Sequence, residues 1–230
     1  MITVAALVSH PPLLFRELGG RSDPVAELRS AALDAVRAVA VAADQVVVVG
    51  PADQSRGWDA AAGVDVRRFG GPGEGSCPPG LPLPLGVGSR LLEEAGWTGP
   101  VDLVSVRASA ESEELDVLAD TLAGRSGRTG LLLLGDGSAR RGTAAPGYVD
   151  ERAFPWDDAV ARALAEGDAA SLARLDVPLA EELMVHGCAS FRLLGAVGER
   201  CGPPSRAALI YRGDPFGVTY FTALWGFPAR

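Results

Sequence analysis

The sequence has 230 residues, of which 47% are hydrophobic and 22% are charged, as in ordinary globular proteins. The 29 acidic residues outnumber the 21 basic ones, and the net charge of −8 disfavours binding to nucleic-acid phosphates. All basic residues are arginine and there is no asparagine, which excludes a Walker A loop, Schiff-base chemistry and N-glycosylation. The chain has only two histidines, which excludes three-His zinc sites, and the wide separation of His10 and His186 excludes HExxH helices and Cys₂His₂ fingers.

The first quarter of the chain predicts a strand, a helix and a second strand. Residues 2–8 form an apolar run that Pro11-Pro12 ends, which indicates a buried strand. Asp23-Pro24 has the pattern of an N-cap followed by proline, and the apolar spacing after it predicts a helix over 24–42. Residues 45–49 are a second buried strand, and 64–69 are a weaker third one.

The remainder predicts further alternation of strands and helices. Residues 70–84 are rich in glycine and proline around Cys77 and predict a surface loop, which could act as a lid. The elements expected after it are a helix at 89–95, a strand at 101–106, a helix around 115–122, a strand at 130–134, helices at 155–166, 168–175, 178–185 and 189–199, and strands at 207–211 and 218–225.

This alternation predicts an α/β fold. Because the last two strands are separated only by a turn at 214–217, we expect a central mixed, largely parallel sheet flanked by helices. No repeat or linker divides the sequence, so we expect one layered domain over residues 1–230.

The sequence also predicts a compartment. The three cysteines lack CxxC spacing, which favours a reducing environment. No basic region precedes the first apolar run, and no apolar run reaches the length of a membrane helix. We therefore expect a cytoplasmic protein that binds neither membrane nor nucleic acid.

Polar residues follow the predicted strands, where ligands collect in open α/β sheets. His10 could be a metal ligand, an acid–base group or a histidine that only hydrogen-bonds a loop. Asp136 and Ser138 lie in a Gly-Asp-Gly-Ser turn, with Arg140 and Arg141 beside it. This turn could hold a carboxylate or phosphate, or could be a tight turn in which Asp136 caps backbone N–H groups.

A second group of residues has simpler interpretations. His186 and Cys188 could share a metal or form a nucleophilic pair, but a packing cysteine beside a surface histidine is the favoured interpretation. Asp157-Asp158 and Glu181-Glu182 are expected to be solvated faces or first-turn carboxylates. Tyr220 and Trp225 are expected in the core.

Five segments spread over nearly the whole chain carry a family resemblance. They are Val8-Ser9-His10-Pro11-Pro12-Leu13-Leu14, Val48-Val49-Gly50-Pro51, Leu134-Gly135-Asp136-Gly137-Ser138-Ala139-Arg140, Ala145-Pro146-Gly147-Tyr148-Val149-Asp150, and Tyr211 through Tyr220 with Trp225. The set resembles the LigB-like, class III extradiol ring-cleavage dioxygenases, in a compact actinobacterial-type branch.

The resemblance implies a mixed sheet, often in homodimers, and Fe(II) held by two histidines and a carboxylate. His10 matches the first metal histidine. Asp53 and Gln54 stand where the second is expected, and Ala139 stands where an acid–base histidine is expected. The usual set is therefore incomplete. An altered site for Fe(II) or another divalent metal would use His10, Asp53 and a third donor among His186, Cys188 and Glu182, and a chain without metal is the equal alternative.

These observations predict a diverged dioxygenase-like protein with a sheet-end pocket for a small anionic or aromatic molecule. The alternatives are a metal-dependent ring-cleavage oxidoreductase with an altered ligand set, and a non-catalytic interaction module; a homodimer is the partner implied. The candidate residues are His10, Asp136 and Ser138 for catalysis, Asp53, Arg140, Arg141 and Tyr148 for ligand binding, and His10, Asp53 and His186 for metal.

Overall fold

The computed structural model describes residues 1–72, 80–143 and 145–228. Within them, one seven-stranded sheet has the order β3-β4-β2-β5-β1-β7-β6. The strands are β1 (Ile2–Val8), β2 (Gln45–Ala52), β3 (Arg56–Trp58), β4 (Val101–Arg107), β5 (Thr129–Leu134), β6 (Arg206–Gly213) and β7 (Tyr220–Gly226).

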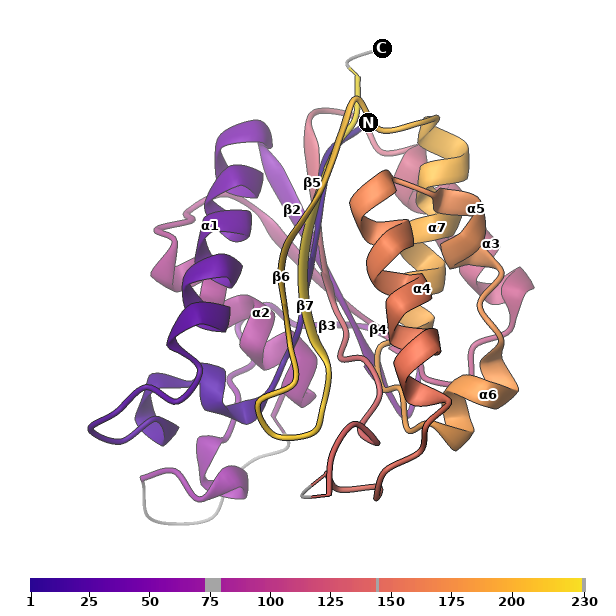
Figure 1. Ribbon diagram of the computed structural model, residues 1–230. Helices are drawn as coiled ribbons and strands as arrows, with labels where there is room; N and C mark the ends of the chain where they lie inside the picture. The colour runs from indigo at the N-terminus through magenta and orange to yellow at the C-terminus, as the bar shows by residue number, and fades with distance from the viewer. Residues whose placement is uncertain (73–79, 144, 229–230) are drawn as a thin grey trace.

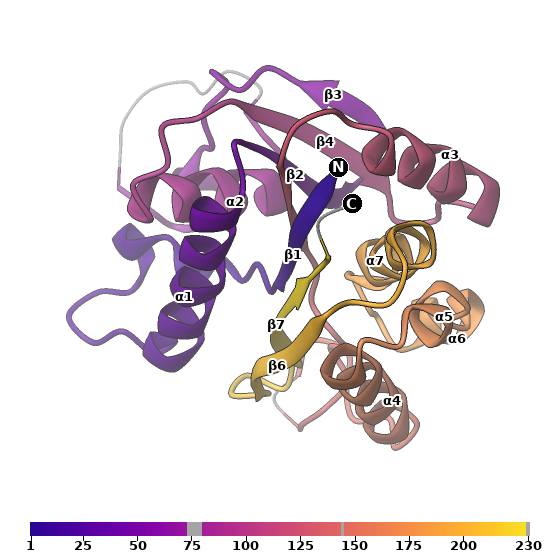
Figure 2. The same ribbon diagram turned by 90° about the horizontal axis from the view of Figure 1, so that it is seen from above.

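Helices cover both faces of this sheet. They are α1 (Ala26–Ala42), α2 (Leu83–Glu94), α3 (Ser112–Ala123), α4 (Ala153–Glu166), α5 (Ala169–Ala173), α6 (Val177–Glu182) and α7 (Cys188–Cys201), with short 3₁₀ helices at Pro12–Leu14, Arg16–Leu18 and Val66–Phe69. α1 and α2 lie on one face, and α3 to α7 lie on the other (Figures 1 and 2).

The centre of the sheet is parallel and its margins are antiparallel. β1 and β2 each pair in parallel with β5, which lies between them, and β4 pairs in parallel with β2. β7 and β6 add antiparallel strands at one margin, and β3 adds one at the other. The predicted α/β fold with a mixed, largely parallel sheet flanked by helices is thereby confirmed.

The fully buried β5 shows why an unbroken apolar run forms the middle of the sheet. Leu131 and Leu133 pack into the core under α3 to α7, whereas Leu132 and Leu134 pack into the core under α1 and α2. A strand covered on both faces needs apolar side chains at every position rather than at alternate ones. Tyr220 and Trp225 are buried as predicted.

Two local predictions were wrong. Residues 64–69 do not form a strand, because the Asp65 carboxylate accepts a hydrogen bond from the backbone N–H of Arg67 at 3.1 Å and begins the 3₁₀ helix Val66–Phe69. The edge strand β3 was not predicted. α2 begins at Leu83, so the predicted loop at 70–84 ends earlier than expected, and Cys77 lies outside the described residues.

Among the helices in the described part of the chain, none combines the length and the apolar composition required to cross a bilayer.

Candidate functional site

The carboxyl ends of the four parallel strands meet at one edge of the sheet, at the bottom of Figure 1. The connection from β2 to β4 carries α2 on one face of the sheet, whereas the connection from β4 to β5 carries α3 on the other. Crevices form where successive connections leave a sheet on opposite faces, and ligands bind there. A ligand site is therefore expected at the turns that follow β1, β2, β4 and β5.

His10 and Asp136 meet where the adjacent strands β1 and β5 end. The backbone N–H of His10 donates to Asp136 Oδ1 at 2.7 Å, and the ring Nδ1 lies 3.5 Å from the same oxygen. The Asp136 carbonyl accepts from the N–H of Gly187 at 2.8 Å. A Cβ on Gly187 would lie 2.6 Å from that carbonyl oxygen, so only glycine permits this approach.

Burial lowers the pKa of His10 below its ordinary value of 6.5; Asp136 opposes this shift, and the charge of nearby His186 adds to it. The ring is therefore neutral at pH 7, and its contact with Asp136 is not an ion pair. Its Nδ1 is buried without a hydrogen-bond partner in the described structure. His10 is thus a desolvated imidazole beside a carboxylate.

Ser138 is fully buried and holds the turn after β5. Its hydroxyl donates to the Leu183 carbonyl at 2.8 Å and accepts from the Arg140 N–H at 3.1 Å. Its own N–H donates to Asp157 Oδ1 at 3.1 Å. The Ser138 hydroxyl therefore both donates and accepts a hydrogen bond within the protein. This arrangement is typical of a residue that positions a turn rather than of a nucleophile.

Asp157 was expected on a solvated face or in the first turn of a helix, and both interpretations were wrong, because it is buried beyond the first turn of α4. Its side chain is fully buried, and Oδ2 accepts from the Thr219 hydroxyl at 2.6 Å. Burial raises its pKa to about 6 against the opposing effects of Thr219, Ser138 and Arg141. Its neighbour Asp158 is exposed and pairs with Arg212.

The three remaining candidates near this turn differ in their surroundings. Arg141 Nε lies 3.1 Å from Asp214 and 3.7 Å from Asp157, and its guanidinium covers the Phe154 ring at 4.1 Å. Arg140 Nε is buried, with no hydrogen-bond partner within the described residues. Tyr148 is 81% exposed.

The predicted metal ligands do not form a metal site. The described residues contain no group of three His, Cys, Asp or Glu side chains placed to hold a metal ion. β5 separates β1 from β2, so the strand ends before His10 and Asp53 are about 10 Å apart at the usual strand spacing. His10 and Asp136 supply two donors, which do not fit the Fe(II) triad that the family resemblance implies.

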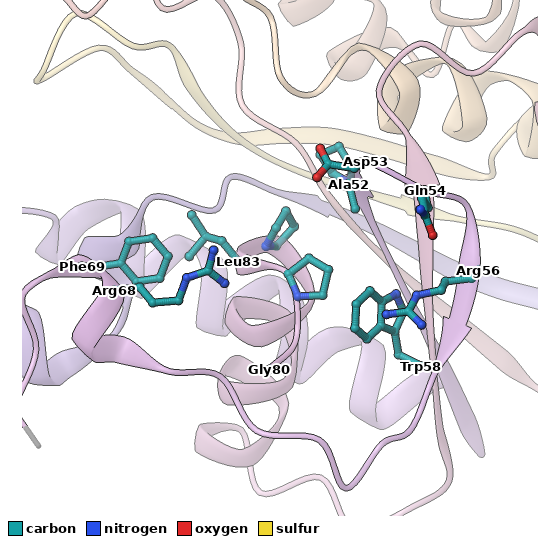
Figure 3. A pocket seen from close by; sticks show the side chains of 12 residues that line it. Ala52, Asp53, Gln54, Arg56, Trp58, Arg68, Phe69, Gly80 and Leu83 are labelled. Atoms are coloured by element: carbon teal, nitrogen blue, oxygen red, sulfur yellow. The ribbon is translucent and has the colours of Figure 1, made fainter. Parts of the chain in front are cut away.

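Two clefts open at the carboxyl end of β2, and both are lined by Ala52 and Asp53. The first, which we call the aromatic cleft, has a volume of about 550 Å³ and contains Arg56, Trp58, Arg68 and Phe69 (Figure 3). The second, which we call the acidic cleft, has a volume of about 450 Å³ and contains Glu181, Met184, His186 and Cys188. Of the eight predicted site residues, Asp53 and His186 line these clefts, and so does Cys188, one of the alternative metal donors.

The walls of the aromatic cleft are fixed from behind. The Trp58 indole N–H donates to Ser105 Oγ at 2.8 Å, and the Arg56 guanidinium lies 3.6 Å from the centre of the indole ring. On the opposite wall, Phe69 stacks on the buried Phe15 with ring centres 6.5 Å apart. Figure 3 shows Arg68 with Phe69 on one side of the cleft and Arg56 with Trp58 on the other. The Trp58 and Phe69 rings are therefore held in place as apolar surfaces on two sides of the cleft.

Arg56 and Arg68 differ from the arginines beside them. Arg67 pairs with Asp65 at 2.8 Å, and Arg107 pairs with Glu114 at 2.7 Å. In the part of the chain that the structure describes, no carboxylate lies within ion-pair distance of Arg56 or Arg68. Although the net charge of the chain is −8, the described residues thus leave two guanidinium groups of one cleft without an ion-pair partner.

The Cys188 thiol is not an activated nucleophile. Burial raises its pKa to about 11, while Arg192 opposes the shift and Glu181 adds to it. The thiol is protonated at neutral pH, and thiolate is the reactive form. His186, by contrast, is exposed at the turn between α6 and α7, which agrees with the packing interpretation of this pair.

The aromatic cleft was missed by sequence reasoning. Arg56 and Trp58 lie on a strand of three residues, and Arg68 and Phe69 lie on the 3₁₀ helix that was taken for a strand. A usable signal for that helix was Asp65 two residues before Arg67, a capping pattern. No local sequence pattern predicts that these two segments lie on opposite sides of one cleft.

Comparison with solved structures finds the crystal structure of an uncharacterized protein, JW3007, from Escherichia coli K12. The TM-score is 0.51, the sequence identity is 13%, and the match covers 97% of this chain and 100% of that chain. At this identity the likeness shows the fold alone. No family model matches the sequence, and no curated protein matches it.

Proposed function

We propose that this chain is a diverged LigB-like protein that binds a small aromatic anion in the aromatic cleft. The observation that carries the proposal is that Arg56 and Arg68, for which the described residues supply no carboxylate partner, line the same cleft as the fixed rings of Trp58 and Phe69. A guanidinium group binds a carboxylate through two parallel N–H donors, and the rings supply apolar contact area. The resemblance around His10-Pro11-Pro12 supports the family assignment.

The proposal does not include metal chemistry. Fe(II) bound to two histidines and a carboxylate would activate O₂ and a catechol, but the described donor set does not fit that group. His10 and Asp136 remain as a neutral imidazole and a carboxylate at the ends of β1 and β5. They lie outside the lining of the aromatic cleft, so binding there does not depend on them.

The test is calorimetric titration with benzoate, with uncharged benzamide as the matched ligand. We expect benzoate to bind more tightly than benzamide, because benzamide lacks the carboxylate. Arg68→Ala should weaken benzoate binding about threefold to tenfold, the usual effect of losing one partly solvated charged hydrogen bond. Arg162→Ala, an exposed arginine of α4 outside the cleft, should bind like the wild type.

Two results would count against this function. Equal binding of benzoate by the wild type and Arg68→Ala would show that benzoate does not bind in the aromatic cleft. Near-stoichiometric Fe(II) after anaerobic loading, lost in His10→Ala, would favour the ring-cleavage oxidoreductase with an altered ligand set instead.

A further inference from the structure

The two clefts share Ala52 and Asp53 in their linings and lie on opposite faces of the sheet. α2 and the 3₁₀ helix Val66–Phe69 form walls of the aromatic cleft, whereas α6 and the beginning of α7 form walls of the acidic cleft. Ala52 and Asp53 contribute to both. The clefts are therefore neighbours at the carboxyl end of β2.

The charges of the two clefts are opposite in sign. Arg56 and Arg68 contribute positive charge to the aromatic cleft, and no carboxylate among the described residues pairs with either. The acidic cleft contains the exposed carboxylates of Asp53 and Glu181, for which the described structure gives no ion-pair partner. The charge of Arg107 at the same cleft is compensated by Glu114 at 2.7 Å.

The acidic cleft also has an apolar wall. Val177 and Ala180 of α6 line it, followed by Met184 and Val185 in the turn that leads to α7. Methylene groups of a ligand can lie along this wall, at about 0.8 kcal/mol per fully buried group. The cleft therefore suits an alkyl chain that ends in a positive charge.

We propose that the two clefts are subsites of one groove, whose ligand carries an aromatic carboxylate at one end and an alkylamine at the other. The inference rests on the proposed function, because the carboxylate end occupies the aromatic cleft. The amine then lies between Asp53 and Glu181. An α-amino acid does not meet this requirement, since both of its charges are on one carbon atom.

The test compares two ligands of nearly equal shape, 4-(3-aminopropyl)benzoate and 4-butylbenzoate, by calorimetric titration at pH 7.5 and low salt. The amine is charged at this pH. We expect the amine compound to bind up to about fivefold more tightly, the upper range for exposed ion pairs. Glu181→Gln, which changes a residue of the acidic cleft alone, should reduce this difference and leave 4-butylbenzoate binding unchanged.

The control is Glu182→Gln, the neighbouring exposed carboxylate, which pairs with Arg152 and is not part of the acidic cleft. It should keep the preference for the amine. Equal affinities of the two compounds, with both still weakened in Arg68→Ala, would overturn the groove and leave the proposed function standing. Failure of benzoate and both longer compounds to bind would overturn the proposed function as well.

Discussion

His10 and Asp136, 126 positions apart in the sequence, are joined by a hydrogen bond from the backbone N–H of His10 to Asp136 Oδ1 at 2.7 Å. The ring Nδ1 is farther from the same oxygen, at 3.5 Å. The backbone, and not the imidazole, therefore orients the carboxylate. A substitution of the His10 side chain alone should therefore leave Asp136 in place. The effects of such a substitution can then be assigned to the loss of the imidazole.

The first prediction concerns the pH dependence of stability at His10. Burial lowers its pKa in the folded state, so the unfolded chain binds the proton more tightly and the native state loses stability as the pH falls through about 6.5. We expect the unfolding free energy of His10→Gln, from urea titrations at pH 7.5, 6 and 5, to fall less than that of the wild type.

His186→Gln is the matched control, since the other histidine of the chain is exposed. Because the charge of His186 is the smallest of the three causes that shift the pKa of His10, this variant should keep most of the wild-type dependence on pH. A difference between wild type and His10→Gln that is the same at all three pH values would contradict the burial of an uncharged imidazole.

The second prediction concerns Asp157, whose pKa is raised to about 6 from 3.8. The native state binds this proton more tightly than the unfolded chain, so the contribution is complete below pH 3.8 and is lost as the pH rises through 6. Two pKa units correspond to roughly 3 kcal/mol. Relative to the wild type, Asp157→Asn should gain up to about that amount between pH 4 and pH 7.5, because an amide does not ionise.

The measurement is again urea unfolding, with Asp158→Asn as the control. Asp158 is the exposed neighbour on the same helix. Its variant should run parallel to the wild type over this pH range. Parallel profiles for wild type and Asp157→Asn would show that the Asp157 carboxylate is not desolvated in the native state.

The third prediction separates a structural role of Ser138 from a catalytic one. Ser138→Ala leaves the Leu183 carbonyl and the Arg140 N–H without their buried partner. We expect a loss of about 1–3 kcal/mol in unfolding free energy, with benzoate affinity unchanged. Ser205→Ala, which removes an exposed hydrogen bond to Gly226, should cost less. A stable Ser138→Ala protein that no longer binds benzoate would place Ser138 at the ligand.

The elements that could be predicted are those with a periodic apolar pattern. The strand predicted at 2–8 agrees with β1, and the helix predicted at 24–42 agrees with α1 apart from its first turn. Both bury their apolar side chains in a sheet covered on two faces, so local pattern and tertiary environment agree. β3 has three residues, including Gly57, and it forms a strand because it pairs with β4.

The site was predicted less well, because its residues are brought together by topology. Proximity of His10 and Asp136 follows from parallel pairing of β1 with β5. Burial of Asp157 was also readable: Ala153, Val160 and Ala161 are one helical turn away and buried, so the helix period places the carboxylate on the apolar face. The aromatic cleft is formed by β3 and the 3₁₀ helix Val66–Phe69, and neither has a periodic apolar pattern.

The position of β1 in the sheet has a consequence for synthesis on the ribosome. β1 is made first, yet its two neighbours are β5 and β7, which follow more than 120 and more than 210 residues later. β2 and β4 are much closer together in sequence and can pair while translation continues. The apolar segment Ile2–Val8 therefore emerges before the strands that it pairs with have been synthesised. Long-range pairing of this kind makes folding slow and leaves apolar segments exposed, so that chaperones can bind them.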